Sequence, residues 1–258
     1  MESLDILVLA PHPDDAELCC GGLLLKARDA GLSFGIIDVT RGEMATRGSV
    51  RQRQKEAAAA SRILKLAVRD NLGLPDGHLR DDETLRRELV RKLRRYRPHT
   101  VLLPHWEDQH PDHAAVGQAG IYAAWLAGAP RFEPSSGKGV ASADRAPYRP
   151  KRLLHYNNRY GINADIVIDI SSVIDAKMEL ARCYVTQFGP AAADASDEGA
   201  GMLQTRLSHA GFFDWFRGMH AYYGSQAGVQ YGEAYCSKGP LCVEAVGSFF
   251  ANPEGAPL

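Results

Sequence analysis

The sequence lacks an excess of charge of either sign. Its 258 residues include 30 Lys and Arg and 31 Asp and Glu, which gives a formal net charge of -1. Proteins that bind nucleic acid or an anionic membrane surface usually carry a clear basic excess. The basic residues in 86–97 recur between apolar ones at helical spacing, which favours a solvated helix face over a phosphate-binding patch. We therefore expect a small-molecule partner, no nucleic acid and no membrane.

Long apolar runs and paired cysteines are also missing. No apolar segment is long enough to span a bilayer, and the first residues, Met-Glu-Ser-Leu-Asp, lack the basic region of a signal peptide. The five cysteines are odd in number and include no Cys-x-x-Cys pair, so neither a disulfide framework nor a cysteine metal site is indicated. We expect buried free thiols and a cytoplasmic protein.

The sequence contains no internal repeat and no heptad run, and shows instead an alternation of apolar segments and helix-like stretches. This alternation favours a Rossmann-like α/β fold, with a mostly parallel sheet flanked by helices and a site at the C-terminal ends of the strands. We expect a single domain over 1–258, with a surface insertion at about 130–150 and a candidate lid loop at about 189–201. The predicted strands are 6–9, 34–39, 72–74, 100–104, 153–156 and 166–170, and the predicted helices are 16–30, 50–66, 83–97, 114–127, 172–183 and 203–223.

A histidine and two aspartates follow the first predicted strand. His12 is flanked by two prolines, and Asp14 and Asp15 come next, before a helix-like stretch. In an open parallel sheet the ligand crevice lies outside the carboxyl ends of the strands. If 6–9 is a strand of such a sheet, these three side chains lie at that crevice.

A second cluster of the same residue types, His110, Asp112 and His113, follows the predicted strand 100–104. Each cluster offers two potential ligands three residues apart. Two imidazoles and one carboxylate leave coordination positions open, as in hydrolytic zinc sites, and the same ligand set also serves non-haem Fe(II) oxygenases. A lone His-Pro-Asp is more often a turn, but two clusters at two strand ends favour a metal site.

These motifs resemble the paired signatures of the LmbE-like or PIG-L-like zinc-dependent N-deacetylase family. The first is Pro-His-Pro-Asp-Asp-Ala-Glu at 11–17, followed by Gly21 and Gly22, and the second is His-Pro-Asp-His at 110–113. Within the family, the chain most resembles the bacillithiol-pathway branch, which removes acetate from N-acetylglucosaminyl malate. The similarity covers most of the chain and extends through 40–43, 53–64, 74–76, 166–171, 187–188 and 231–238.

The resemblance implies a metal-dependent amidohydrolase that acts on an N-acetylglucosamine conjugate. His12, Asp15 and His113 match the metal ligands, with Zn²⁺ as the implied ion and another divalent metal such as Fe²⁺ as the alternative. Asp14 matches the general base that deprotonates the metal-bound water.

The remaining site residues are also implied by the resemblance. His110 matches a protonated histidine that assists the oxyanion or the leaving amine, and Asp112 matches the partner that keeps this histidine charged. Arg53 matches a basic residue near the substrate, suited to a sugar hydroxyl or to the malate carboxylate. Asp76 is a candidate for binding sugar hydroxyls, and Glu17 is expected to support the site from behind.

Two residues depart from the bacillithiol branch. Phe212 and Met219 occupy positions where that branch usually carries Tyr and Arg, which affects the assignment of the substrate more than that of the reaction. The family also implies a homo-oligomer.

Two rival functions remain open. A non-haem Fe(II) oxygenase uses the same ligand set, but it needs no additional acid and base, and such sites usually lie on an all-β scaffold. A catalytically silent sugar-binding or assembly protein would keep the fold and use the aromatic stretch 212–223 as an interface.

Overall fold

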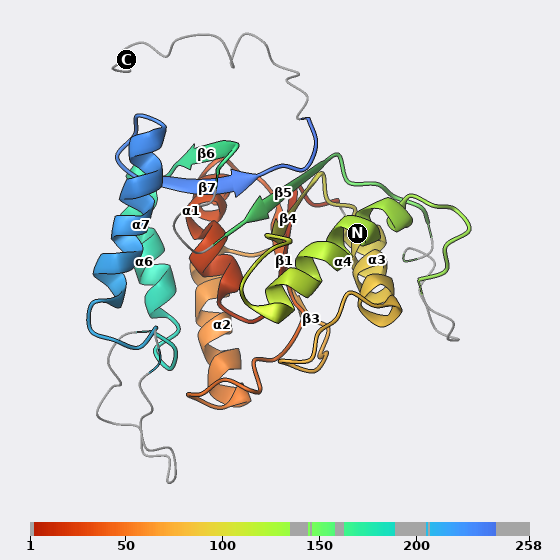
Figure 1. Cartoon of the computed structure of the whole chain (residues 1–258), viewed down its shortest axis with the longest axis horizontal. Coiled ribbons are helices and arrows are strands. Elements are labelled where there is room, and N and C mark those ends of the chain that lie inside the picture. The colour runs from red at the N-terminus through yellow and green to blue at the C-terminus, as the bar shows by residue number, and fades with distance from the viewer. Residues whose placement is uncertain are drawn as a thin grey trace.

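The computed structural model describes residues 3–134, 144, 146–157, 163–188, 205 and 207–240. The described strands form one seven-stranded sheet with the order β3-β2-β1-β4-β5-β7-β6 (Figure 1). The strands are β1 (Ile6–Ala10), β2 (Phe34–Asp38), β3 (Val68–Asn71), β4 (Thr100–Pro104), β5 (Arg152–Tyr156), β6 (Ile166–Asp169) and β7 (Gly232–Cys236). The helices are α1 (Asp15–Asp29), α2 (Val50–Leu64), α3 (Glu83–Tyr96), α4 (Pro111–Ala127), the 3₁₀ turn η1 (Ser171–Val173), α6 (Ile174–Arg182) and α7 (Phe212–Gln226).

The first five strands run parallel, and the sheet is mixed only at one edge. β1 pairs in parallel with β2 and with β4, and β3 and β5 extend the parallel part outward. β7 is antiparallel to both β5 and β6. The predicted mostly parallel α/β sheet is therefore confirmed.

The strand order reverses between β1 and β4. The chain proceeds from β1 through β2 to β3 on one side, and it returns to pair β4 with the opposite edge of β1. In doubly wound folds the ligand crevice lies at this switch point, outside the carboxyl ends of the two strands. Both His-Asp clusters of the sequence follow these two strands.

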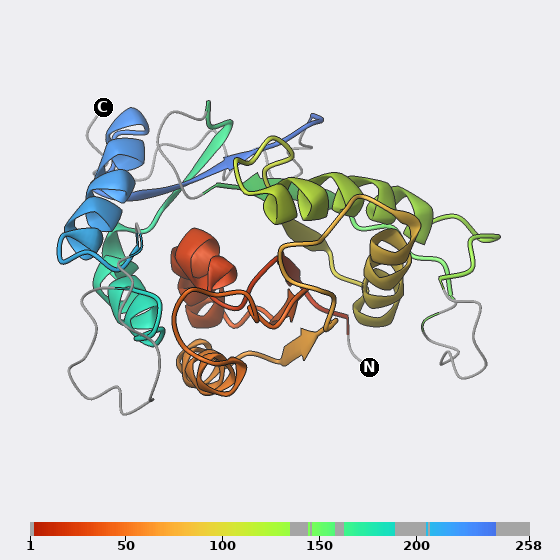
Figure 2. The ribbon, with the colours of Figure 1, turned by 60° about the horizontal axis from the view of Figure 1, so that its bottom comes forward.

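The two faces of the sheet carry separate apolar cores because side chains alternate along each strand. Val8 of β1 lies in the core shared with α1, α2, α6 and α7, whereas Leu7 and Leu9 lie in the core shared with α3 and α4. Figure 2 shows these two groups of helices apart from each other, with α3 and α4 on the right. None of the helices within the described ranges is long and apolar enough to cross a membrane.

Two helix starts differ by three residues or more from the sequence prediction. α4 begins at Pro111, not at 114, because Pro111 suits the first turn of a helix and the His110 side chain caps that turn by accepting from the Asp112 N–H. Asp112 and His113 thus lie in the first turn of α4 and not in a loop. α7 begins at Phe212, later than the predicted 203, with turns over 207–211.

Two strands also differ from the prediction. The third strand is Val68–Asn71, and 72–74 follows it as irregular structure. β7 was not predicted as a strand at all. The candidate lid loop at 189–201 lies outside the described residues, as do residues 135–143 and 145 of the proposed insertion at 130–150.

Candidate active site

The segments after β1 and β4 bring the three predicted metal ligands together. His12 Nδ1 and His113 Nε2 each lie 3.2 Å from Asp15 Oδ2. Asp15 and His113 are buried, and the His12 side chain is 14% exposed. The ligand atoms of this group all lie within 4.8 Å of one another.

These separations fit a divalent ion. A tetrahedral zinc bound about 2.0–2.1 Å from nitrogen and oxygen ligands holds its donor atoms roughly 3.3 Å apart. Burial alone would raise the pKa of Asp15, but His113 and His12 outweigh it and hold that pKa well below its usual range. The group is therefore a carboxylate between two imidazoles at the spacing that an ion requires.

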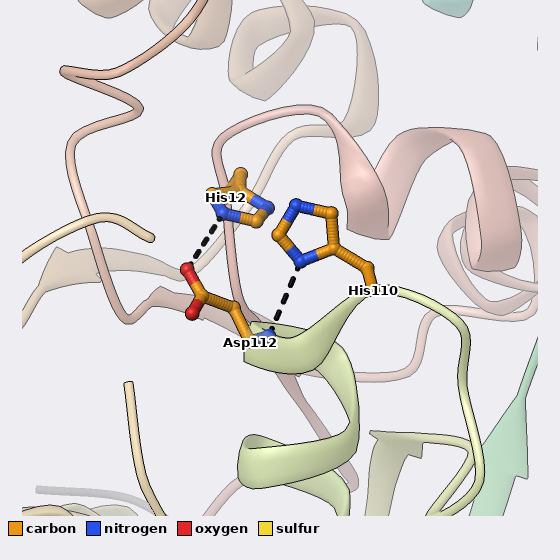
Figure 3. A group of neighbouring side chains, drawn as sticks. All are labelled: His12, His110 and Asp112. Atoms are coloured by element: carbon orange, nitrogen blue, oxygen red, sulfur yellow. Dashed lines mark hydrogen bonds and ion pairs between the residues drawn. The ribbon is translucent and has the colours of Figure 1, made fainter. Parts of the chain in front are cut away.

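A second possible ligand group, His12, His110 and Asp112, shares His12 with the first (Figure 3). In this group Asp112 already accepts two backbone hydrogen bonds, from Gly77 N to Oδ2 at 2.8 Å and from Leu79 N to Oδ1 at 3.1 Å. Because its oxygens are committed to these amides, Asp112 is the poorer ligand, and the group with Asp15 suits an ion better.

Asp14, the residue before the predicted ligand Asp15, has an unusual backbone conformation. Its φ of 139° and ψ of -28° at the start of α1 lie where side-chain-bearing residues are rarely found. The carboxylate is buried, and its Oδ2 accepts from Arg53 Nη1 at 2.8 Å. Burial raises the pKa of Asp14 to about 7, although Arg53 opposes the shift.

Arg53 is a buried cation with partners inside the protein. It is 5% exposed, and its Nη1 also donates to the Pro13 carbonyl. Its Nε has no hydrogen-bond partner and lies 4.0 Å from Glu56 Oε2. In this arrangement the guanidinium holds Asp14 and the turn that carries it.

The expected pairing of Asp112 with His110 differs from the one in the structure. The Asp112 carboxylate lies 3.3 Å from His12 Nε2, while His110 Nδ1 accepts a hydrogen bond from the Asp112 backbone N–H (Figure 3). Burial together with His113 and His12 lowers the pKa of His110. The lowered pKa favours the neutral form of His110, whereas the resemblance implied a protonated histidine.

Asp76 is likewise engaged within the protein. Its Oδ1 lies 2.9 Å from His12 Nε2, and its Oδ2 accepts from the Met44 backbone N–H at 2.9 Å. The binding of sugar hydroxyls by Asp76 stays a prediction.

Asp108 is a site residue that the sequence reasoning missed. Its Oδ2 lies 3.5 Å from His113 Nδ1, and its Oδ1 accepts from the His110 backbone N–H at 2.9 Å. Histidine ligands commonly use their second nitrogen in this way, on a carboxylate that fixes the ring. A carboxylate two residues before the His-Pro-Asp-His motif was the available signal.

A buried ionic group supports α1 below the site. Glu17 Oε1 accepts from Arg69 and from the Tyr184 hydroxyl at 2.8 Å, and Arg69 also makes a two-bond contact with Asp38 at 2.8 and 3.0 Å. This agrees with the supporting position expected for Glu17.

Phe212 and Met219, the two departures from the bacillithiol branch, are both buried in the core shared with α1 and α6. Phe212 stacks on Phe188 with ring centroids 4.9 Å apart. These residues contribute packing at this position of α7.

The switch point of the sheet and the His12, Asp15 and His113 group beside it describe an α/β protein with a possible metal site, of the ligand type that hydrolases use. A family model described as PIG-L, GlcNAc-PI de-N-acetylase, matches residues 7–124. The chain is 31% identical over 193 residues to a diacetylchitobiose deacetylase from Thermococcus kodakarensis, with 71% of this chain and 70% of that protein covered.

Two further similarities agree with this match. The chain is 27% identical over 205 residues to a Bacillus subtilis protein named probable N-acetyl-alpha-D-glucosaminyl L-malate deacetylase 2, with 70% of this chain and 82% of that protein covered. It is also similar to the crystal structure of a conserved protein from Thermus thermophilus, at 37% identity and a TM-score of 0.78 over 94% of this chain and 98% of that one. The chain belongs to the PIG-L, or LmbE-like, deacetylase family.

Proposed function

We propose that the protein is a metal-dependent N-deacetylase that hydrolyses the acetamide of an N-acetylglucosamine conjugate and releases acetate and a free amine. The observation that carries the proposal is the convergence of His12 and His113 on Asp15, with Asp14 next to Asp15 in the chain and its buried carboxylate held by Arg53. The names of the relatives, deacetylases of acetylated amino sugars, support the same reaction.

His12, Asp15 and His113 would hold the ion, Zn²⁺ or Fe²⁺. When bound, it supplies a Lewis acid that polarises the amide carbonyl and lowers the pKa of water. The protein's own groups then move the protons. Asp14 accepts the proton of the attacking water at Oδ1, because its Oδ2 is occupied by Arg53.

His110 supplies a hydrogen bond to the reacting acetamide. Its Nδ1 accepts from the Asp112 backbone N–H, so the neutral ring carries its proton on Nε2. That N–H can stabilise the oxyanion through a hydrogen bond, and Asp14, protonated by the water, then gives that proton to the leaving amine nitrogen as the C–N bond breaks. Asp112 keeps its predicted importance, but through its backbone N–H to His110 and its carboxylate to His12.

The substrate is proposed at two levels. An N-acetylglucosaminide is the substrate class, and N-acetylglucosaminyl malate of the bacillithiol pathway is the first compound to test. Diacetylchitobiose belongs in the same assay, because Arg53, which was expected to suit a sugar hydroxyl or the malate carboxylate, is bound to Asp14. A single domain, a homo-oligomeric state and a cytoplasmic location complete the proposal.

The test replaces Asp14 with Asn and measures acetate release from both compounds. We expect kcat to fall by about 10²–10⁴-fold at unchanged metal content, because a positioned base contributes that much. Asp29→Asn, an exposed carboxylate at the far end of α1, is the matched control and should be fully active. Full activity of Asp14→Asn would refute the mechanism.

The rival functions give different results in the same preparation. An Fe(II) oxygenase would be inactive with zinc in the absence of oxygen. A silent binding protein would bind an N-acetylglucosaminide tightly and release no acetate.

A further inference from the structure

His12 is contacted on both ring nitrogens, and the two nitrogens face different groups. Nδ1 lies 3.2 Å from Asp15 Oδ2, on the side of His113. Nε2 lies 2.9 Å from Asp76 Oδ1 and 3.3 Å from Asp112 Oδ2. A neutral imidazole carries one N–H donor and one lone pair, so its two contacts decide which nitrogen is free for an ion.

We infer that Asp76 is a positioning residue that, together with Asp112, holds the N–H on His12 Nε2 and leaves Nδ1 as the metal-binding atom. The inference rests on the proposed metal site. It replaces the sequence-based role of Asp76 as a sugar-binding group with one directed at the ion.

Backbone amides orient both carboxylates that contact His12. Asp76 Oδ2 accepts from the Met44 N–H at 2.9 Å, which orients Oδ1 toward the histidine. Asp112 accepts from two amides of the segment that follows Asp76, namely Gly77 N and Leu79 N. Each carboxylate therefore has a backbone anchor and one side chain to act on, His12.

The segment 76–79 owes this geometry to its turn. Gly77 has a φ of 73°, a left-handed conformation that glycine adopts without strain, and a Cβ there would lie 2.8 Å from Met44 Sδ. This turn places the Asp76 side chain against His12 and lets the neighbouring Gly77 N–H donate to Asp112. A third segment of the chain, after β3, thus orients a ligand supplied by the segment after β1.

Carboxylate contacts to the second nitrogen of a histidine ligand fix its tautomer and raise its basicity, and their loss typically weakens metal binding by about 10–100-fold. Asp76 and Asp15 therefore have different tasks on one ring. Asp15 would share the ion with Nδ1, and Asp76 would hold the opposite N–H.

The first measurement is the state of the His12 ring in the zinc-loaded wild-type protein, observed by NMR with ¹⁵N-labelled histidine. We expect a proton on Nε2 and none on Nδ1. A proton on Nδ1, or a ring that does not respond to zinc, would overturn the inference without any variant being made.

The second measurement is the dissociation constant for Zn²⁺, obtained by chelator competition on Asp76→Ala and Asp76→Asn. We expect about 10–100-fold weaker binding for Asp76→Ala, and a smaller change for Asp76→Asn because its amide oxygen can still accept the N–H. Asp214→Ala, an exposed carboxylate on α7, is the control and should bind zinc as the wild type does.

The alternative role of Asp76 gives a different pattern. If Asp76 binds sugar, Asp76→Ala raises KM for the acetylated substrate while its zinc affinity stays within about twofold of the wild type, and the inference is wrong. If zinc affinity falls as expected but no variant and no wild-type protein releases acetate, the inference holds and the proposed function fails.

Discussion

Replacing Arg53 with Met tests whether this residue holds the base or binds the substrate. In the structure Arg53 donates to Asp14 Oδ2 at 2.8 Å and to the Pro13 carbonyl, and it is 5% exposed. A hydrogen bond to a charged group contributes about 1.5–3 kcal/mol. If that energy selects the productive orientation of Asp14, its loss lowers the population of that orientation by roughly 10–150-fold.

We therefore expect Arg53→Met to lower kcat for acetate release by about 10–150-fold with little change in KM, because the interaction acts on the base and not on bound substrate. Arg51→Met, an exposed neighbour on α2, is the matched control and should retain both constants. Zinc content and urea unfolding, measured on the same samples, separate loss of the base from loss of the fold. A rise in KM at unchanged kcat would refute the argument and restore Arg53 as a substrate-binding residue.

Two further predictions concern stability. Glu233→Gln should lower the free energy of unfolding by about 3–5 kcal/mol, because it leaves the buried Lys177 ammonium without its carboxylate partner. Lys177→Met should lower it by less, because Glu233 then still accepts from the Tyr235 hydroxyl and from two backbone amides of α1. Equal losses for the two variants in urea titrations would contradict this. Burial lowers the pKa of His155 from its ordinary 6.5 to about 4. As the pH falls, the unfolded chain therefore binds the proton before the folded protein does, and up to about 3 kcal/mol of the free energy of unfolding should be lost between pH 6.5 and pH 4. His155→Gln should remove that part of the acid sensitivity. The prediction is wrong if the variant and the wild type differ in free energy of unfolding by the same amount at about pH 7.5 and at about pH 4.5.

The part of the fold that positions the site could be predicted because its strands are buried on both faces. β1 and β4 appear in the sequence as short continuous apolar runs, and each is followed by a His-Asp cluster. The convergence of His12, Asp15 and His113 follows from the rule that neighbouring parallel strands end at the same edge.

β3 could not be recognised from apolar residues because its own side chains are mostly polar. Arg69 reaches Glu17 and Asp38, and Asp70 accepts from Lys92 and the Tyr96 hydroxyl. The apolar leucines just after the strand, at 72 and 74, pack on the core from irregular structure. The polar residues of β3 therefore find their partners on other elements of the fold, which the local sequence does not show.

β7 could not be predicted from the sequence for a related reason. It is short and contains Glu233, a residue type that rarely lies in a strand interior. Its carboxylate is nevertheless buried, because Lys177 and the amides of Gly22 and Leu23 all donate to it. Those partners lie far from Glu233 in the sequence, so no local pattern predicts them.

Within the site, spacing identified residue types but not their pairings. Asp112 is two residues from His110 in sequence, yet its carboxylate contacts His12, because α4 begins at Pro111 and turns that side chain toward the segment 76–79. Pairings of this kind depend on where a helix begins, within a residue or two, and that boundary is the least certain part of a pattern.

The backbone of Asp14 has a consequence for any attempt to engineer this protein. A φ of 139° costs of order 1–3 kcal/mol for a residue with a side chain, whereas glycine adopts it freely. Glycine at this position would relieve that strain, but it would also leave the buried Arg53 guanidinium without its carboxylate partner, which costs at least as much. Libraries built on this scaffold should keep position 14 fixed, because the backbone strain, the buried ion pair and the proposed base all belong to that one residue.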